Sequence, residues 1–223
     1  MKCIVFDAGT LITFSMNCML SILKDLKKSF DGKFLITKDV EYEIVNRPKN
    51  IKKYKLGALR MKSLIDKGIL EFPESVGVSH VDVERRAKEY IKQLNSTFKT
   101  RGRDMHIIDK GEASCLALSK LLDEKGIKNV IAIDERSTRM ICEKPENLKL
   151  LLERKLHTKI QVKREINDCR DIKFIRSTEL IYIAYKKGII QDKSKDMLDA
   201  LLYGAKFKGC AVSSEEIKEL KKL

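Results

Sequence analysis

Short runs of apolar residues alternate along this chain with longer stretches in which apolar residues recur every three or four positions. The runs at residues 3–6, 34–36, 69–72 and 129–134 are typical of buried strands, because they are short and nearly continuous. The longer stretches predict helices that include residues 51–67, 81–98 and 110–125. Strands that alternate with helices form a parallel sheet covered on both faces. The pattern therefore predicts an α/β fold, a three-layer α/β/α sandwich with a central, mainly parallel sheet.

Local signals refine the ends of these elements. Apolar residues at positions 16, 19, 20, 23 and 26 predict one helix after the first strand. Thr37 is a suitable N-cap for the helix that carries Glu43, and Pro48 is expected to end it. Gly68 and Gly126 follow helical stretches, where a glycine commonly closes the last turn.

The periodic pattern loosens between about residue 143 and residue 176. Pro145 and a mixture of charges interrupt it, and only one helical stretch to about residue 156 and a short strand at 159–163 stand out. The helical pattern then returns and continues to the end of the chain. With no internal repeat and no long linker, the sequence predicts a single domain over residues 1–223 with an ordered inserted arm at about 143–176.

Composition narrows the class of protein. The 223 residues are 43% apolar and 35% charged, with only three prolines, which excludes collagen-like and disordered chains. Lys and Arg number 46 against 32 Asp and Glu, so the formal net charge is +14. Such an excess of positive charge favours a polyanionic partner.

The cysteines and histidines do not suggest a soft metal site. The six cysteines lie at positions 3, 18, 115, 142, 169 and 210, too far apart for any Cys-x-x-Cys pair. We expect them to be buried, reduced thiols of an intracellular protein. Asp7 interrupts the first apolar run too early for a signal peptide, and no window approaches the roughly 20 apolar residues of a membrane span. The expected location is the cytoplasm, with no membrane partner.

Four carboxylates occupy positions that meet at one edge of the predicted sheet. Asp7 and Asp134 close two strands, Glu43 lies in the helix after the second strand, and Glu112 begins the long apolar helix. Ligands of open parallel sheets bind outside the carboxyl ends of the strands. Carboxylates so close together repel one another unless a cation neutralises them, and Mg²⁺ or Mn²⁺ prefers such oxygen ligands. A bound ion of this kind can activate water for attack on a phosphodiester.

Each of these residues also has a local explanation. The two aspartates could cap the helices that follow their strands. Asp109 and Glu112 are spaced as a capping box, and Glu43 could be a solvated residue that pairs with Arg47 one turn later. The joint occurrence of the four acidic residues in this order is the stronger signal.

Four short motifs carry a resemblance to a known family. They are Ile4-Val5-Phe6-Asp7, Thr37-x-x-Val40-x-x-Glu43, Gly111-Glu112-Ala113-Ser114 and Ala132-Ile133-Asp134-Glu135-Arg136. In this order they resemble the PIN domain, the nuclease fold related to flap endonucleases, and in particular archaeal PIN proteins. The resemblance covers residues 1 to about 142 and 177 to 223, and leaves the arm unmatched.

The resemblance implies a metal-dependent endoribonuclease. Asp7, Glu43, Glu112 and Asp134 would be the catalytic, metal-binding set, with Glu135 as an outer ligand. It also implies a supporting hydroxyl, for which Thr10 is the candidate, although the family often places it two residues after the first Asp, where this chain has Gly9. PIN domains often form dimers, so a homodimer is a further expectation.

A competing motif lies at the same place. Phe6-Asp7-Ala8-Gly9-Thr10-Leu11 is one residue away from the haloacid-dehalogenase signature Asp-x-Asp-Gly-Thr. The second carboxylate of that signature is missing, and with it the acid–base partner of a phosphohydrolase. The nuclease hypothesis is therefore favoured over this one.

Basic residues cluster next to the predicted site. We predict that RNA phosphates are bound by Arg47, Lys49, Lys52, Lys53, Lys55, Arg101 and Arg103. The stretch after Glu43 could equally be a solvated basic helix. Aromatic residues are 6% of the chain and Trp is absent, so contacts dominated by the RNA backbone are expected.

Two other functions stay open at this point. A non-catalytic RNA-binding or scaffold module would keep the fold and bind RNA in a salt-sensitive way without metal-dependent turnover. A toxin-type ribonuclease of a toxin–antitoxin pair would share the chemistry of a housekeeping nuclease, but the length and the arm favour the latter.

Overall fold

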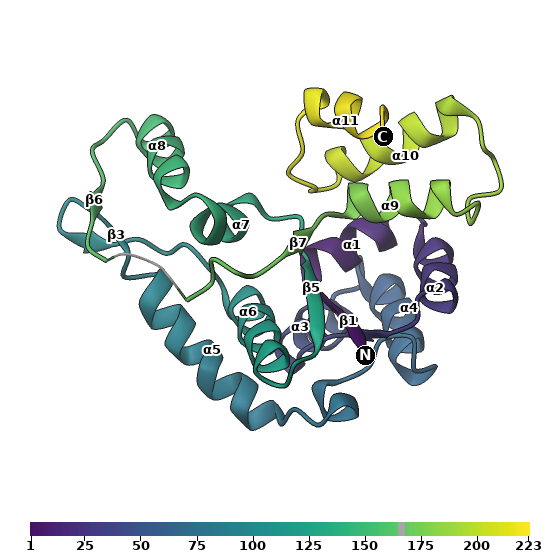
Figure 1. Ribbon diagram of the computed structural model, residues 1–223, viewed down its shortest axis with the longest axis horizontal. Coiled ribbons are helices and arrows are strands. Elements are labelled where there is room, and N and C mark those ends of the chain that lie inside the picture. Colours follow the sequence, from purple (N-terminus) through teal and green to yellow (C-terminus); the bar gives the residue numbers. More distant parts are fainter. Residues whose placement is uncertain (165–167) are drawn as a thin grey trace.

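Four parallel strands form the centre of the fold in the computed structural model, which describes residues 1–164 and 168–223 (Figure 1). They are β1 (Lys2–Phe6), β2 (Lys33–Leu35), β5 (Lys128–Ala132) and β7 (Phe174–Ile175), in the order β2-β1-β5-β7. β1 and β5 pair over their whole length, from Lys2 beside Lys128 to Phe6 beside Ala132. Because all four strands run the same way, their carboxyl ends meet at one edge.

Helices cover both faces of this sheet, which confirms the predicted three-layer α/β/α architecture. One side carries α5 (His80–Leu94) and α6 (Lys110–Glu124). The other carries α1 (Ala8–Met16), α2 (Leu20–Ser29), α9 (Ser177–Lys186) and α10 (Lys195–Phe207), followed by α11 (Ser214–Leu220). Buried apolar side chains of the strands hold the layers together, such as Phe6 and Phe34, whose rings lie 4.9 Å apart.

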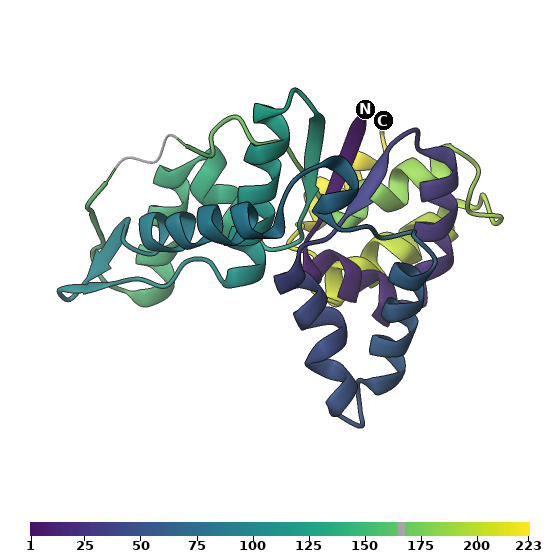
Figure 2. The same ribbon diagram turned by 90° about the horizontal axis from the view of Figure 1, so that it is seen from below.

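A helical hairpin projects from this body between β2 and α5. It contains α3 (Lys38–Glu41), the π-helical turn η1 (Tyr42–Asn46), the short 3₁₀ helix η2 (Pro48–Asn50) and α4 (Lys55–Asp66). Figure 2 shows it in dark blue, pointing away from the sheet. A second 3₁₀ helix, η3 (Pro73–Val76), leads from the hairpin to α5.

Several local predictions are confirmed. The Thr37 hydroxyl accepts a hydrogen bond from Val40 N and so caps α3, and Gly68 and Gly126 have the positive φ angles of 66° and 69° that end helices. Two predictions are wrong. The expected single helix after β1 is broken at Cys18, whose φ is 58°. The expected strand at 69–72 contributes only one bridge, between Leu35 and Glu71.

An arm lies beside the sandwich, to the left in Figure 1. It contains a three-stranded antiparallel sheet of β4 (Arg103–Asp104), β3 (Phe98–Thr100) and β6 (Gln161–Val162), together with α7 (Arg136–Glu143) and α8 (Pro145–Leu156). The predicted insertion at 143–176 is thus only part of this arm, because the β3–β4 hairpin comes from an earlier segment. That range also includes β7, which belongs to the central sheet.

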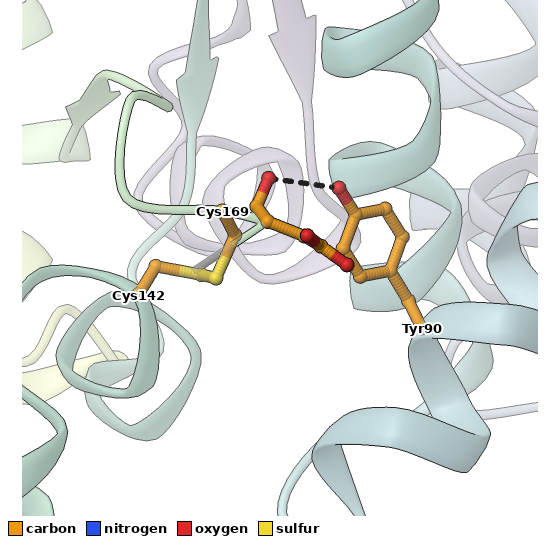
Figure 3. The surroundings of a disulfide bond; sticks show 4 residues. Tyr90, Cys142 and Cys169 are labelled. Carbon is orange, nitrogen blue, oxygen red and sulfur yellow. Dashed lines mark hydrogen bonds between the residues drawn. A yellow bond between two sulfur atoms is a disulfide. The ribbon is translucent and has the colours of Figure 1, made fainter. Parts of the chain in front are cut away.

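A disulfide bond between Cys142 and Cys169 closes the base of the arm (Figure 3). It joins the end of α7 to the segment before β7, across a sequence separation of 27. Tyr90 of α5 donates a hydrogen bond to the Asp168 carbonyl oxygen beside it, at 3.3 Å. The expectation of six buried, reduced thiols is therefore wrong for this pair and for the exposed Cys18, and confirmed for Cys3, Cys115 and Cys210.

Of the helices in the described ranges, none combines the length and the apolar character needed to cross a membrane.

Candidate functional site

Five carboxylates lie at the carboxyl edge of the central sheet, and we call this group the acidic edge: Asp7, Glu43, Glu112, Asp134 and Glu135. Asp7 directly follows β1, and its backbone N–H donates to Ala132 O of β5 at 2.9 Å. Asp134 follows β5 two residues later. The two aspartates thus stand at the ends of neighbouring strands, as the sequence predicted.

Asp7 is almost completely buried, with 5% of its surface exposed. Its Oδ2 accepts a hydrogen bond from Gly9 N at 2.9 Å, which caps α1. Burial, together with the charges of Glu43 and Asp134, raises the pKa of Asp7 to about 7, against the backbone hydrogen bonds that lower it. Asp7 therefore both caps a helix and belongs to a group of mutually repelling carboxylates.

Asp134 is held by the C-terminal part of the chain. Its Oδ1 accepts a hydrogen bond from Ser177 N at 2.8 Å, at the first residue of α9, and its carbonyl oxygen accepts one from Ala211 N at 3.0 Å. Its Oδ2 is buried and has no hydrogen-bond partner among the described residues. An unpartnered buried carboxylate oxygen is costly, by about 1–3 kcal/mol or more for a charged group.

Glu43 reaches the acidic edge from the projecting hairpin. It lies in the π-helical turn η1 against the first turn of α6, where Gly111 N donates a hydrogen bond to it. A Cβ on Gly111 would lie only 2.5 Å from Glu43 Oε1, so a side chain there would collide with the carboxylate. Burial raises the pKa of Glu43, as do the charges of Asp109 and Asp39.

Glu112 and Glu135 complete the edge from the starts of two helices. Glu112 Oε2 accepts a hydrogen bond from Asp109 N at 2.9 Å, the capping-box contact expected from the sequence. Glu135 Oε2 accepts one from Thr138 N at 2.7 Å and caps α7. Burial raises the pKa of Glu112 to about 8, and the charges of Asp7 and Glu135 contribute to the increase. All five predicted carboxylates therefore lie within electrostatic reach of another member.

The acidic edge offers only hard oxygen donors. Among residues 1–164 and 168–223, no three His, Cys, Asp or Glu side chains stand close enough together to hold one ion as they are now oriented. The donor chemistry nevertheless fits Mg²⁺ or Mn²⁺, because the ligands are carboxylates and Asp134 Oδ2 is buried without a partner. Thr10, in the first turn of α1, is also fully buried with an unpartnered hydroxyl in the described structure.

The basic residues predicted to bind RNA fall into two separate places. Those that follow Glu43 are all exposed and lie between the end of η1 and the start of α4 in the projecting hairpin: Arg47, Lys49, Lys52, Lys53 and Lys55. Arg47 is near enough to Glu43 to lower the pKa of that carboxyl group. Arg101 and Arg103 were expected beside Glu112, but they lie at the β3–β4 turn in the arm. The prediction for Arg101 and Arg103 relied on their closeness to Glu112 in sequence, but the chain returns from the β3–β4 turn before α6 begins.

The sequence analysis assigned no positioning role to two residues that contact the acidic edge, Gly111 and Ser177. The sequence offered a signal for Gly111, because glycine has a poor helix propensity and its presence in the first turn of a helix indicates a packing or functional constraint. Ser177 had no local signal, because its contact with Asp134 depends on β7 lying next to β5.

Comparisons with protein-family models, with curated proteins and with solved structures find no match to this chain.

Proposed function

We propose that this protein is a metal-dependent endoribonuclease of the PIN type. The observation that carries the proposal is the acidic edge itself. Two buried aspartates at the ends of adjacent strands lie near Glu43 and Glu112 from two other segments, and the charges of neighbouring carboxylates contribute to the raised pKa values of Asp7 and Glu112. Burial of several negative charges in one place is expensive unless a cation balances them. Such sites are typical of function rather than of stability.

Asp134, with its unpartnered Oδ2, and Asp7 are the residues that we expect to bind the ion most directly. Glu43 and Glu112 are half-buried and would complete the oxygen ligand set, with Glu135 as an outer ligand. Mg²⁺ or Mn²⁺ in such a site lowers the pKa of a bound water and neutralises charge on the phosphoryl oxygens. Asp7 and Asp134 would hold the ion, and their burial would limit the access of bulk water to it.

The projecting hairpin supports a polyanionic substrate. Arg47 lies one turn from Glu43, so its cation is placed to bind a phosphate next to the acidic edge. Lys49, Lys52, Lys53 and Lys55 extend this charge along the tip. None of the five forms an ion pair within the described residues, which leaves them available for phosphates.

The test is metal-dependent cleavage of RNA by the full chain. The wild type should cut unstructured RNA with Mn²⁺ or Mg²⁺ and not with EDTA, and Asp7→Asn should abolish cutting while RNA binding is retained. Asp25→Asn, at the surface of α2, removes the same charge away from the sheet edge and serves as the control. Undiminished cutting by Asp7→Asn would remove Asp7 from the site.

A second candidate is the non-catalytic RNA-binding module. It is favoured by the current orientation of the carboxylates, each of which accepts a backbone hydrogen bond and no three of which, in the described part of the chain, are poised around one point. It predicts RNA binding that weakens with salt and no turnover with either metal. The haloacid-dehalogenase alternative is less supported, because a nucleophile must be accessible and Asp7 is buried.

A further inference from the structure

The arm contains a groove that lies apart from the acidic edge. It has a volume of about 340 Å³ and lies between α8 and the three-stranded sheet. This volume is at the lower end of the range of pockets that take small ligands, about 300–1,000 Å³. The groove is therefore large enough for a unit the size of one nucleotide.

The floor of the groove is apolar. Leu150 of α8 and Val162 of β6 line it with 51% and 53% of their surfaces exposed, and Phe98 of β3 lies beneath them. Single exposed apolar residues are ordinary at a protein surface. Two that face one hollow from different elements provide a surface for a flat, apolar group such as the face of a base.

Cations surround this floor. Lys149 and Arg164 line the groove, and Arg101 and Arg103 lie on the adjoining β3–β4 hairpin. Lys99 and Lys163 share a single carboxylate, that of Asp104, at 3.8 and 3.6 Å. Glu146 is an acidic residue in the lining, and the nearest pairing of Lys149 is a long contact of 3.9 Å with Glu153. Among the described residues that line the groove, cations therefore outnumber carboxylates.

The arm also adjoins the acidic edge along the chain. Glu135 caps α7, and α7 leads directly into α8, which forms one wall of the groove. Figure 1 shows α7 between the central sheet and α8. The disulfide bond between Cys142 and Cys169 joins the end of α7 to the segment before β7, so the helix that leads into the groove wall is crosslinked next to the central sheet.

We propose that this arm groove is a second binding site for single-stranded RNA, in which Lys149 and Arg164 bind phosphates and Leu150 and Val162 contact a base. A polyanion with flat apolar groups matches both features of the groove. RNA is also the substrate class of the proposed nuclease, and in this choice of ligand the inference rests on that function. Binding in the arm does not depend on catalysis, and it is measured without it.

The experiment measures binding of a fluorescent oligouridine to the full chain in EDTA, in an Asp7→Asn background, over a range of salt concentrations. The double variant Lys149→Gln, Arg164→Gln should bind about tenfold more weakly and have a shallower salt dependence, with the slope reduced by about 1.4 for two lost phosphate contacts on a single strand. Leu150→Ala with Val162→Thr should weaken binding and leave the slope unchanged, because no charge is removed.

The control is Lys125→Gln with Lys128→Gln, which removes the same charge at the opposite edge of the sheet. Equal affinity and slope in the control and the Lys149, Arg164 variant would overturn the proposal. It would also be overturned if polyaspartate displaced the RNA as effectively as oligouridine at equal charge, which would indicate a site for an acidic polypeptide. Failure of the nuclease assignment would leave this binding intact, so the two failures are distinguishable.

Discussion

The acidic edge and the arm differ in the sign and the burial of their charged side chains. At the acidic edge, carboxylates are buried beside one another, and burial raises the pKa values of Asp7 and Glu112 to about 7 and about 8. In the arm, the cations line an open groove, where Arg164 is exposed and Lys149 is half-buried. Exposed charges cost little, whereas buried like charges lower the stability of the fold. The comparison indicates that the acidic edge lowers the stability of the fold, whereas the arm is stabilised by ordinary packing and a disulfide bond.

The largest expected effect concerns the cost of the buried carboxylates. The pKa of Asp7 is higher in the folded state than in the unfolded state, so the folded protein keeps the Asp7 proton to a higher pH. The contribution of Asp7 to the free energy of unfolding is therefore lost as the pH rises from about 4 to above about 7. In EDTA at high pH, Asp7→Asn should therefore raise the free energy of unfolding by on the order of 3–4 kcal/mol, with little effect at low pH. Asn keeps the helix cap. Urea unfolding at both pH values measures this, and a variant less stable than wild type at high pH would contradict it.

The arm should instead lose stability when its crosslink is removed. In the chain-entropy view, a disulfide that closes a loop of 27 residues contributes about 3.5 kcal/mol. Cys142→Ser with Cys169→Ser should lower the free energy of unfolding by about this amount, as measured with urea. Added dithiothreitol should reproduce the loss in the wild type and have no effect on the variant. An unchanged midpoint in both would mean that the two thiols are not joined in solution.

Gly111 tests the geometry of the acidic edge directly. Gly111→Ala would place a Cβ 2.5 Å from Glu43 Oε1 and push that carboxylate out of position. Misplacement of a catalytic group by about 1 Å lowers activity by about 100-fold. Gly57→Ala is the matched control, because its Cβ would lie 3.6 Å from the nearest atom, Ser15 Oγ. RNA cleavage assays compare the two, and equal activity would show that Glu43 need not lie against α6.

The smallest expected effect comes from removing the single hydrogen bond that Ser177 N donates to Asp134 Oδ1. Ser177 is the first residue of α9, where proline is well accommodated, and the preceding Arg176 has the extended backbone that proline requires (φ −100°, ψ 166°). Ser177→Pro removes the N–H that donates to Asp134 Oδ1, whereas Ser177→Ala retains it. We expect about a tenfold loss of metal-dependent cleavage for proline, in line with one lost hydrogen bond to a charged group, and near wild-type activity for alanine. Equal rates for the two variants would mean that this hydrogen bond does not position Asp134.

The same comparison explains what the sequence could predict. Asp7 and Asp134 follow apolar runs directly, so their meeting at one edge follows from parallel pairing alone. Thr37 and the Asp109–Glu112 capping box are likewise local signals. The arm was only partly predicted, because its sheet joins β3 and β6 from segments about sixty residues apart and its disulfide joins Cys142 to Cys169. Ser177 was missed for the same reason, since no local pattern indicates a contact between the ends of β5 and β7.

The most direct test of the central claim is the anomalous diffraction of Mn²⁺ in crystals of the full chain soaked with that ion. We expect a peak at the carboxyl edge of the sheet, within coordination distance of Asp134 Oδ2 and Asp7, at about 2.1 Å for a hard octahedral ion. We also expect Glu43 or Glu112 to turn from its backbone hydrogen bond toward the ion. A fully occupied peak elsewhere, with these carboxylates unmoved, would contradict the metal-dependent mechanism.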